Sequence, residues 1–163
     1  MEEYPDLVQA ESQAGHEVGN HSFSHPYLTK CGQFVREREL EHTDMDLDLL
    51  GCPKMDRLIR PPFSAVDDRL TTYVAHNHEH IALWSIDSGD WQGLGSEAIV
   101  KNVLNRVKNG SIVIFHDSDE KGRVDRTPTV EALKVILPAL KARGYELVTV
   151  LELVSGHNPP KIH

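Results

Sequence analysis

Two histidines four residues apart are the first side chains in this sequence that could do chemistry together. His21 and His25 lie in the segment HSFSHP. In an extended chain they would be about 13 Å apart, too far to share a metal ion. On one helical turn their Cβ atoms come within about 6 Å on the same face, which suits zinc–nitrogen bonds of about 2.0–2.1 Å. Such a turn suits one divalent ion, but the spacing alone leaves surface or capping histidines equally open.

Arg60 ends a short predicted strand, LIR, and is followed by Pro61 and Pro62. Consecutive prolines force a rigid, extended path, because each fixes its own φ and restricts the residue before it. A stiff loop could therefore present Arg60 to a site. The alternative is a purely structural loop in which Arg60 pairs with some carboxylate.

Asp87, Asp90 and Trp91 lie in the segment DSGDW, directly after the apolar run HIALWSI. A carboxylate at this strand end could orient a histidine or bind a metal, and Trp91 offers a flat face to a sugar ring. The ordinary alternative is that Asp87 forms a turn and Trp91 packs in the core.

His116 follows SIVIF, a continuous apolar run typical of a strand buried on both faces of a parallel sheet. A partly desolvated histidine at a strand end can transfer protons near neutral pH. The alternative is an edge residue that is only hydrogen-bonded.

An alternation of helices and strands has to position these four groups. Short strands are expected at residues 16–20, 58–60, 80–86, 111–115 and 145–150, and helices at 5–14, 34–50 and 66–77. Two more helices should be capped by Ser96 and by Thr127, the second with Pro128 at its first position and Gly144 after its end. Their inward residues should be Ile99, Val103 and Val107 in the first, and Val130, Leu133, Leu137 and Leu140 in the second.

This order predicts an α/β fold with a parallel sheet, because parallel strands need crossover helices. Ligands bind at the carboxyl ends of such strands, whether the sheet is open or closed into a barrel. The pattern does not decide between those two forms.

The bulk composition is that of one ordinary globular domain. The chain has 163 residues, 39% of them hydrophobic and 26% charged, and a net charge of −8 without a cluster of basic residues. That charge argues against nucleic-acid or anionic-membrane partners. No apolar run approaches the roughly 18 residues of a membrane span. Two cysteines, Cys31 and Cys52, do not make a disulfide framework.

Taken in order, the motifs resemble a known family. GHEVGNHSFSH, RPPF, WSIDSGDW and GSIVIFHD, with similar flanking segments, resemble the polysaccharide deacetylases (NodB-like domains, carbohydrate esterase family four). The resemblance covers nearly the whole chain, which implies a single catalytic domain over residues 1–163. It implies a distorted (β/α) barrel of parallel strands, seven-stranded in the family and here incomplete at the N-terminus.

The resemblance also implies roles for the metal and proton-transfer residues. His21 and His25 correspond to two ligands of a divalent ion, most commonly zinc, with cobalt or nickel as alternatives. His116 corresponds to the general acid that protonates the leaving amine of the sugar. Asp90 corresponds to its carboxylate partner, and an anion there favours the imidazolium form.

Four further residues are assigned by the same resemblance. Arg60 matches the residue that tethers the catalytic base, and the backbone N–H of Phe63 would bind the oxyanion. Ile114 and Trp91 should line a pocket for the acetyl methyl group. Ser64 stands where the family more often has glycine.

The family's first motif, a strand ending in TFDDG, is absent from this sequence. Its two aspartates are the catalytic base and the third metal ligand, so the two histidines fall short of the three protein ligands usual for catalytic zinc. Exposed strand edges could also let the chain self-associate. We expect hydrolysis of acetyl groups on N-acetylated glycans such as chitin oligosaccharides or peptidoglycan, at a secreted or cell-wall location by resemblance. A catalytically incompetent binding remnant and an acetylxylan O-deacetylase are the alternatives.

Overall fold

The computed structural model describes residues 4–52, 57–118 and 124–156 and divides into two compact units. The first unit runs to Leu83 and includes residues 149–151, and the second runs from Trp84 to Val148 and includes residues from 152 onward. Each unit has its own hydrophobic core and its own pair of parallel strands.

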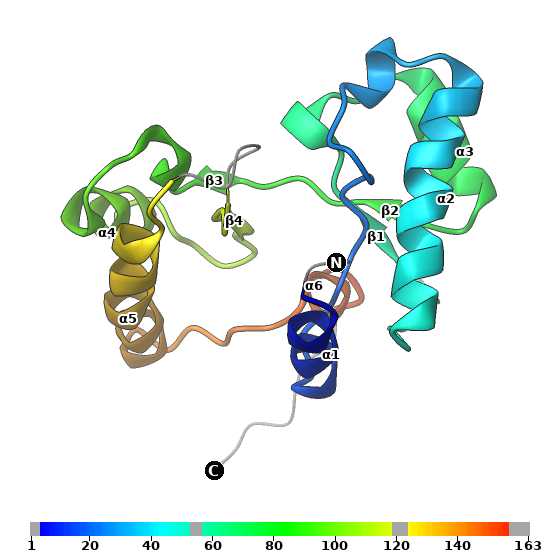
Figure 1. The fold of residues 1–163 in the computed structure, drawn as a ribbon. Coiled ribbons are helices and arrows are strands. Elements are labelled where there is room, and N and C mark those ends of the chain that lie inside the picture. Colours follow the sequence, from blue (N-terminus) through cyan, green and yellow to red (C-terminus); the bar gives the residue numbers. More distant parts are fainter. Residues whose placement is uncertain (1–3, 53–56, 119–123, 157–163) are drawn as a thin grey trace. The chain divides into compact units, whose positions relative to one another are not determined.

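The first unit packs helices against a short parallel sheet (Figure 1). Its elements are α1 (Pro5–Gln13), η1 (Leu28–Lys30), α2 (Gln33–Leu49), β1 (Leu58–Ile59), η2 (Pro62–Ser64), α3 (Asp68–His76) and β2 (His80–Ile81). Asp67 caps α3 by accepting a hydrogen bond from the N–H of Leu70 at 2.8 Å. The core consists of Leu28, Leu40, Ile59, Leu70 and Val74.

The second unit is built around two packed helices (Figure 1). Its elements are β3 (Ile86–Asp87), η3 (Asp90–Gln92), α4 (Ser96–Leu104), β4 (Val113–Ile114) and α5 (Thr127–Ala142), and α6 (Val150–Val154) follows. Ile99 and Val103 of α4 are fully buried, as predicted. They pack with Ala132, Ile136 and Leu140 of α5.

The predicted inward face of α5 was right at Leu140 and wrong at Val130 and Leu137. Val130 is 50% exposed and Leu137 42% exposed, whereas Thr129, Ala132, Ile136 and Leu140 are buried. The predicted capping was also wrong, because Arg126 occupies the N-cap and Pro128 lies in the second helical position. The side chain of Asp125, two residues before Thr127, accepts the N–H of Thr127 at 2.8 Å instead.

The strands are parallel, as predicted, but they are short. β1 pairs with β2 and β3 pairs with β4, in two separate two-stranded sheets, and Asn20 adds an isolated parallel bridge to Ile59. The predicted strand over residues 80–86 splits between the two sheets. Closing a barrel requires each strand to pair on both sides, and the described residues form no closed barrel.

The predicted strand at 145–150 was wrong. Residues 145–149 lie outside any strand, α6 begins at Val150, and Leu147 and Val148 are exposed rather than packed on a sheet. None of the described helices is both long enough and apolar enough to cross a bilayer.

Candidate active site

In the first unit, the predicted site residues gather at the carboxyl end of the parallel strands. The N–H of Asn20 donates to the carbonyl of Leu58 at 2.7 Å, and the N–H of Arg60 donates to the carbonyl of Asn20 at 2.9 Å. This ladder places His21 beside Arg60, and Nδ1 of His21 hydrogen-bonds the Arg60 carbonyl. Residues that follow different strands therefore meet at one edge, as the fold class requires.

The rings of His21 and His25 lie side by side. Their centroids are 4.9 Å apart, with an angle of 73° between the ring planes. The turn between them is not the right-handed helical turn expected from the spacing, because Ser22 and His25 have φ values of 66° and 60°. The Oγ of Ser22 accepts the N–H of His25 at 3.1 Å, which closes this left-handed turn.

Asn20 connects this turn to α2. Its buried amide donates to the Leu40 carbonyl and to Asp44, both at 2.9 Å, and its Oδ1 accepts the N–H of Ser22 at 2.9 Å. Sequence reasoning did not single out Asn20, although its position directly before His21 was a signal for it.

Arg57 extends the same network. Its guanidinium, buried in the first unit, donates to Asp44 and Asp48, each at 2.8 Å. Burial acts to lower the pKa of Arg57, but the hydrogen bonds and charges of the two aspartates outweigh it and raise the pKa. The backbone that carries the two histidines is therefore anchored through Asn20 to a buried ion-pair network.

The donor chemistry of the histidine pair fits part of a metal site. A metal-bound imidazole commonly uses its other ring nitrogen to hydrogen-bond a carbonyl, and the bond from Nδ1 of His21 to the Arg60 carbonyl has that form. Among residues 4–52, 57–118 and 124–156, no group of three or more His, Cys, Asp or Glu side chains could hold a metal ion. The two imidazoles fit such an ion but provide fewer than three donors.

Phe63 lies next to His25. The two rings make an edge contact with centroids 4.9 Å apart, and the other neighbour of Phe63 is Tyr27, stacked at 3.9 Å. Phe63 and Ser64 both have left-handed backbone angles, with φ of 58° and 54°. Ser64 therefore occupies a conformation that glycine adopts without strain.

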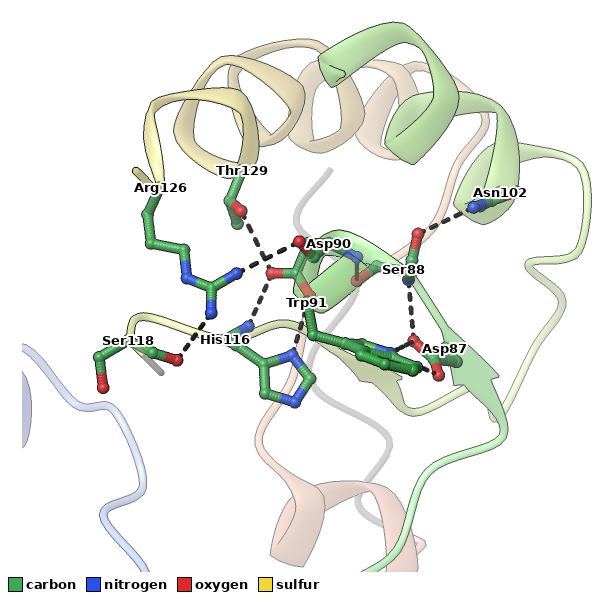
Figure 2. Close-up of polar contacts among 10 residues, drawn as sticks. Asp87, Ser88, Asp90, Trp91, Asn102, His116, Ser118, Arg126 and Thr129 are labelled. Carbon is green, nitrogen blue, oxygen red and sulfur yellow. Dashed lines mark hydrogen bonds and ion pairs between the residues drawn. The ribbon is translucent and has the colours of Figure 1, made fainter. Parts of the chain in front are cut away.

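In the second unit, His116 and Asp90 form a direct pair (Figure 2). Nδ1 of His116 lies 2.8 Å from Oδ1 of Asp90, and the backbone N–H of His116 donates to Oδ2 at 2.8 Å. The two residues follow the adjacent strands β4 and β3. The Asp90 side chain is fully buried, whereas the His116 side chain is 35% exposed.

Burial acts to raise the pKa of Asp90, but the hydrogen bonds and the charge of His116 outweigh it and hold the pKa below its ordinary value. Asp90 is therefore an anion near neutral pH. Because an anionic carboxylate can only accept, Nδ1 of His116 carries the hydrogen. Nε2 is then the ring nitrogen left for proton transfer to another molecule.

Trp91 is 54% exposed, so it is not the core residue of the ordinary alternative. Its indole N–H donates to the Asp87 carboxylate at 3.1 Å, and Asp87 also accepts the N–H of Gly89 at 2.8 Å (Figure 2). Asp87 thus forms a turn that also holds the indole. Ile114 lies buried in β4, and its role beside an acetyl methyl group stays a prediction.

Two residues of the α5 N-terminus contact Asp90 and were missed from the sequence. Thr129 donates its hydroxyl to Oδ2 of Asp90 at 3.2 Å, and Arg126 donates to the Asp90 carbonyl at 3.2 Å (Figure 2). Sequence reasoning treated this segment only as a helix start. The polar pattern RTPT before an apolar helix was the available signal.

Known proteins match this chain along most of its length. A family model described as polysaccharide deacetylase matches residues 1–81. A chitooligosaccharide deacetylase of Sinorhizobium fredii is 36% identical in an alignment of 148 residues that covers 86% of this chain and 68% of the relative. A peptidoglycan-N-acetylglucosamine deacetylase of Bacillus cereus is 32% identical over 91% of this chain, and the chain spans only 53% of that relative's length.

Solved structures also match this chain. The crystal structure of the peptidoglycan N-acetylglucosamine deacetylase Bc1960, in complex with 4-naphthalen-1-yl-N-oxidanyl-benzamide, matches with a TM-score of 0.85 at 29% identity, over 93% of this chain and 69% of that one. BA3943, a family four carbohydrate esterase pseudoenzyme of Bacillus anthracis, matches with a TM-score of 0.81 at 23% identity, over 94% of this chain and 51% of that one. The second match is a likeness of fold alone.

The fold matches that of solved deacetylases and carbohydrate esterases of family four. The chain belongs to the polysaccharide deacetylase family, carbohydrate esterase family four. The resemblance carried by the four sequence motifs is therefore confirmed.

Proposed function

We propose that this chain is a single polysaccharide deacetylase domain that, together with a TFDDG-type segment, hydrolyses acetamido groups of N-acetylated glycans. The observation that carries the proposal is the His116–Asp90 pair. Its nitrogen and oxygen lie 2.8 Å apart at the carboxyl ends of adjacent parallel strands. The relatives described above, a chitooligosaccharide deacetylase and a peptidoglycan-N-acetylglucosamine deacetylase, support the substrate class.

In the proposed reaction, water adds to the acetyl carbonyl, the carbon–nitrogen bond breaks, and acetate and a free amine are released. His116 acts in its imidazolium form, which has a hydrogen on each ring nitrogen: Nε2 gives its proton to the leaving nitrogen, while Nδ1–H stays bonded to the anion of Asp90, which holds the ring in the orientation that exposes Nε2. The proton lost by water goes to the base of the TFDDG-type segment.

His21 and His25 would hold the divalent ion, zinc being the first expectation. When bound, such an ion polarises the acyl oxygen and acidifies a water molecule. Arg60 would orient the base, the N–H of Phe63 would bind the developing oxyanion, and Trp91 with Ile114 would enclose the acetyl methyl group.

The test is acetate release by this chain extended with a TFDDG-type segment, with added divalent ion. Chito-oligosaccharide and peptidoglycan are the expected substrates, and acetylxylan is the comparison that separates amide from ester hydrolysis. His116→Ala should lower kcat by about 10²–10⁴-fold, the range for a general acid, while His76→Ala, an exposed histidine of α3, should leave it unchanged. An extended chain that releases no acetate with any of zinc, cobalt or nickel contradicts the proposal.

The second candidate is a binding remnant without turnover. It is favoured by the absence, among the described residues, of a group of three potential metal ligands, and the same fold occurs in the pseudoenzyme BA3943. Acetate assays on the 163-residue chain decide this point. Turnover that is lost in His116→Ala eliminates the remnant.

A further inference from the structure

Thr129 is a buried hydroxyl residue on the inward face of α5. It is 6% exposed, and the other inward residues of this helix are Ala132, Ile136 and Leu140. A hydroxyl buried among apolar side chains is unfavourable unless it is hydrogen-bonded. Thr129 satisfies this requirement with one long-range side-chain partner, Oδ2 of Asp90, at 3.2 Å.

This bond adds a donor to the Asp90 carboxylate. Oδ1 faces Nδ1 of His116, while Oδ2 accepts both the backbone N–H of His116 and the hydroxyl of Thr129 (Figure 2). The backbone N–H fixes the position of Oδ2, and the hydroxyl adds a second donor from a different element. Rotation of the carboxylate away from the imidazole would have to break both bonds at Oδ2.

Arg126, three residues before Thr129, supports the same arrangement through the backbone. Its guanidinium donates to the Asp90 carbonyl at 3.2 Å and to the Ser118 carbonyl at 2.7 Å (Figure 2). It therefore links the segment that carries Asp90 to the segment that follows His116. The first turn of α5 contacts Asp90 at its carboxylate and at its main chain.

We propose that Thr129 is a positioning residue for the proton donor, which keeps the Asp90 carboxylate turned toward Nδ1 of His116. It acts through Asp90 and touches no reacting atom. The inference rests on the proposed role of His116 as general acid, but it concerns a geometry that can be measured without turnover. It also explains why a polar residue occupies an inward position of an otherwise apolar helix face.

The experiment is nitrogen NMR of the His116 ring in the full 163-residue chain, with the signals assigned by comparison with His116→Ala. Where the ring is neutral, the wild-type protein should show it as the Nδ1–H tautomer, because the Asp90 carboxylate can only accept at Nδ1. Thr129→Val, which keeps the shape and removes the hydroxyl, should raise the fraction of the Nε2–H tautomer about five-fold, the factor that one hydrogen bond of ordinary strength provides. Thr129→Ser should restore the wild-type ratio.

A second matched pair covers the case in which the valine variant does not fold. Thr129→Ser and Thr129→Ala differ only by the hydroxyl, so a higher Nε2–H fraction in the alanine variant supports the proposal. Equal tautomer ratios in all folded variants overturn it, because Thr129 would then only fill space. In the extended, active chain, a positioning role further requires Thr129→Val to lower kcat with little change in KM. A changed tautomer ratio without any acetate release by the wild-type chain supports the positioning role and separately refutes the proposed function.

Discussion

Replacing Asp90 with asparagine tests the physical basis of the site. The wild-type carboxylate only accepts hydrogen bonds, and the donor groups that face it include Nδ1–H of His116, the backbone N–H of His116 and the hydroxyl of Thr129. An amide has one accepting oxygen and one donating nitrogen. In either orientation of the introduced amide, its NH₂ group meets at least one of these donors inside a buried site.

The loss of stability caused by Asp90→Asn can be worked out from these contacts. Each hydrogen bond to a charged group contributes about 1.5–3 kcal/mol, and an unsatisfied buried polar group costs about 1–3 kcal/mol. Asp90→Asn disrupts at least one bond and leaves one donor without an acceptor, so we expect it to lower the free energy of unfolding by about 3 kcal/mol near neutral pH. Asp117→Asn, which changes a carboxylate next to His116 in the sequence, should change it by less than about 0.5 kcal/mol.

The difference in the free energy of unfolding between wild type and Asp90→Asn should also depend on pH. The pKa of Asp90 is lowered in the folded state, so its charge stabilises the fold above the unfolded-state pKa of about 3.9. That stabilisation is lost as the pH falls through the folded value. The gap between wild type and Asp90→Asn should therefore be largest at about pH 6–7 and shrink below about pH 4.

Urea unfolding followed by tryptophan fluorescence measures this directly, since the two tryptophans, Trp84 and Trp91, both belong to the second unit. Equal unfolding free energies for wild type and Asp90→Asn near neutral pH would refute the reasoning. So would a gap that is the same at neutral pH and at about pH 3.5, because the carboxylate charge would then contribute nothing.

Three further changes test the first unit. Ser64→Gly should raise the free energy of unfolding by up to about 1 kcal/mol, because glycine adopts φ of 54° without the strain that serine has there; a loss of stability by circular dichroism would contradict this. Arg57→Met should lower it by about 3 kcal/mol, since the carboxylates that the buried guanidinium pairs with lose their cation; an unchanged urea midpoint would contradict the role of the network. Replacing both His21 and His25 with alanine should weaken Zn²⁺ binding at least about ten-fold by isothermal titration calorimetry, and equal affinity would place the ion elsewhere.

The sequence predicted most helices and the parallel direction of the strands because these depend on local patterns. The helices α1, α2 and α3 begin and end close to their predicted positions. Strand length was less predictable, since a strand exists only where a neighbour pairs with it. The apolar run over residues 80–86 looked continuous, but its two ends pair with different partners.

In the candidate site, too, some features were predictable from the sequence and others were not. Strand-end position singled out His21 and His25 in the first unit, and Asp90 and His116 in the second, because the ligand-binding residues of a parallel fold follow the carboxyl ends of its strands. The left-handed turn at Ser22 could not be predicted from spacing, because a right-handed helical turn also brings residues i and i+4 together. The positive φ values of Ser22 and His25 distinguish the two turns.

The sequence pattern did not predict the inward position of Thr129, and the reason is physical. Hydrophobic periodicity assigned the inward position to Val130, since valine is the more apolar of the two neighbours, yet Val130 is 50% exposed and Thr129 is buried. The helix is rotated so that a hydroxyl reaches the buried carboxylate of Asp90, because an anion in a core needs donors more than the helix needs one further apolar contact. In this helix, a polar residue lies one position before the first apolar residue that was predicted to face inward. Such a residue at the start of an amphipathic helix is evidence that the helix end faces a buried charge.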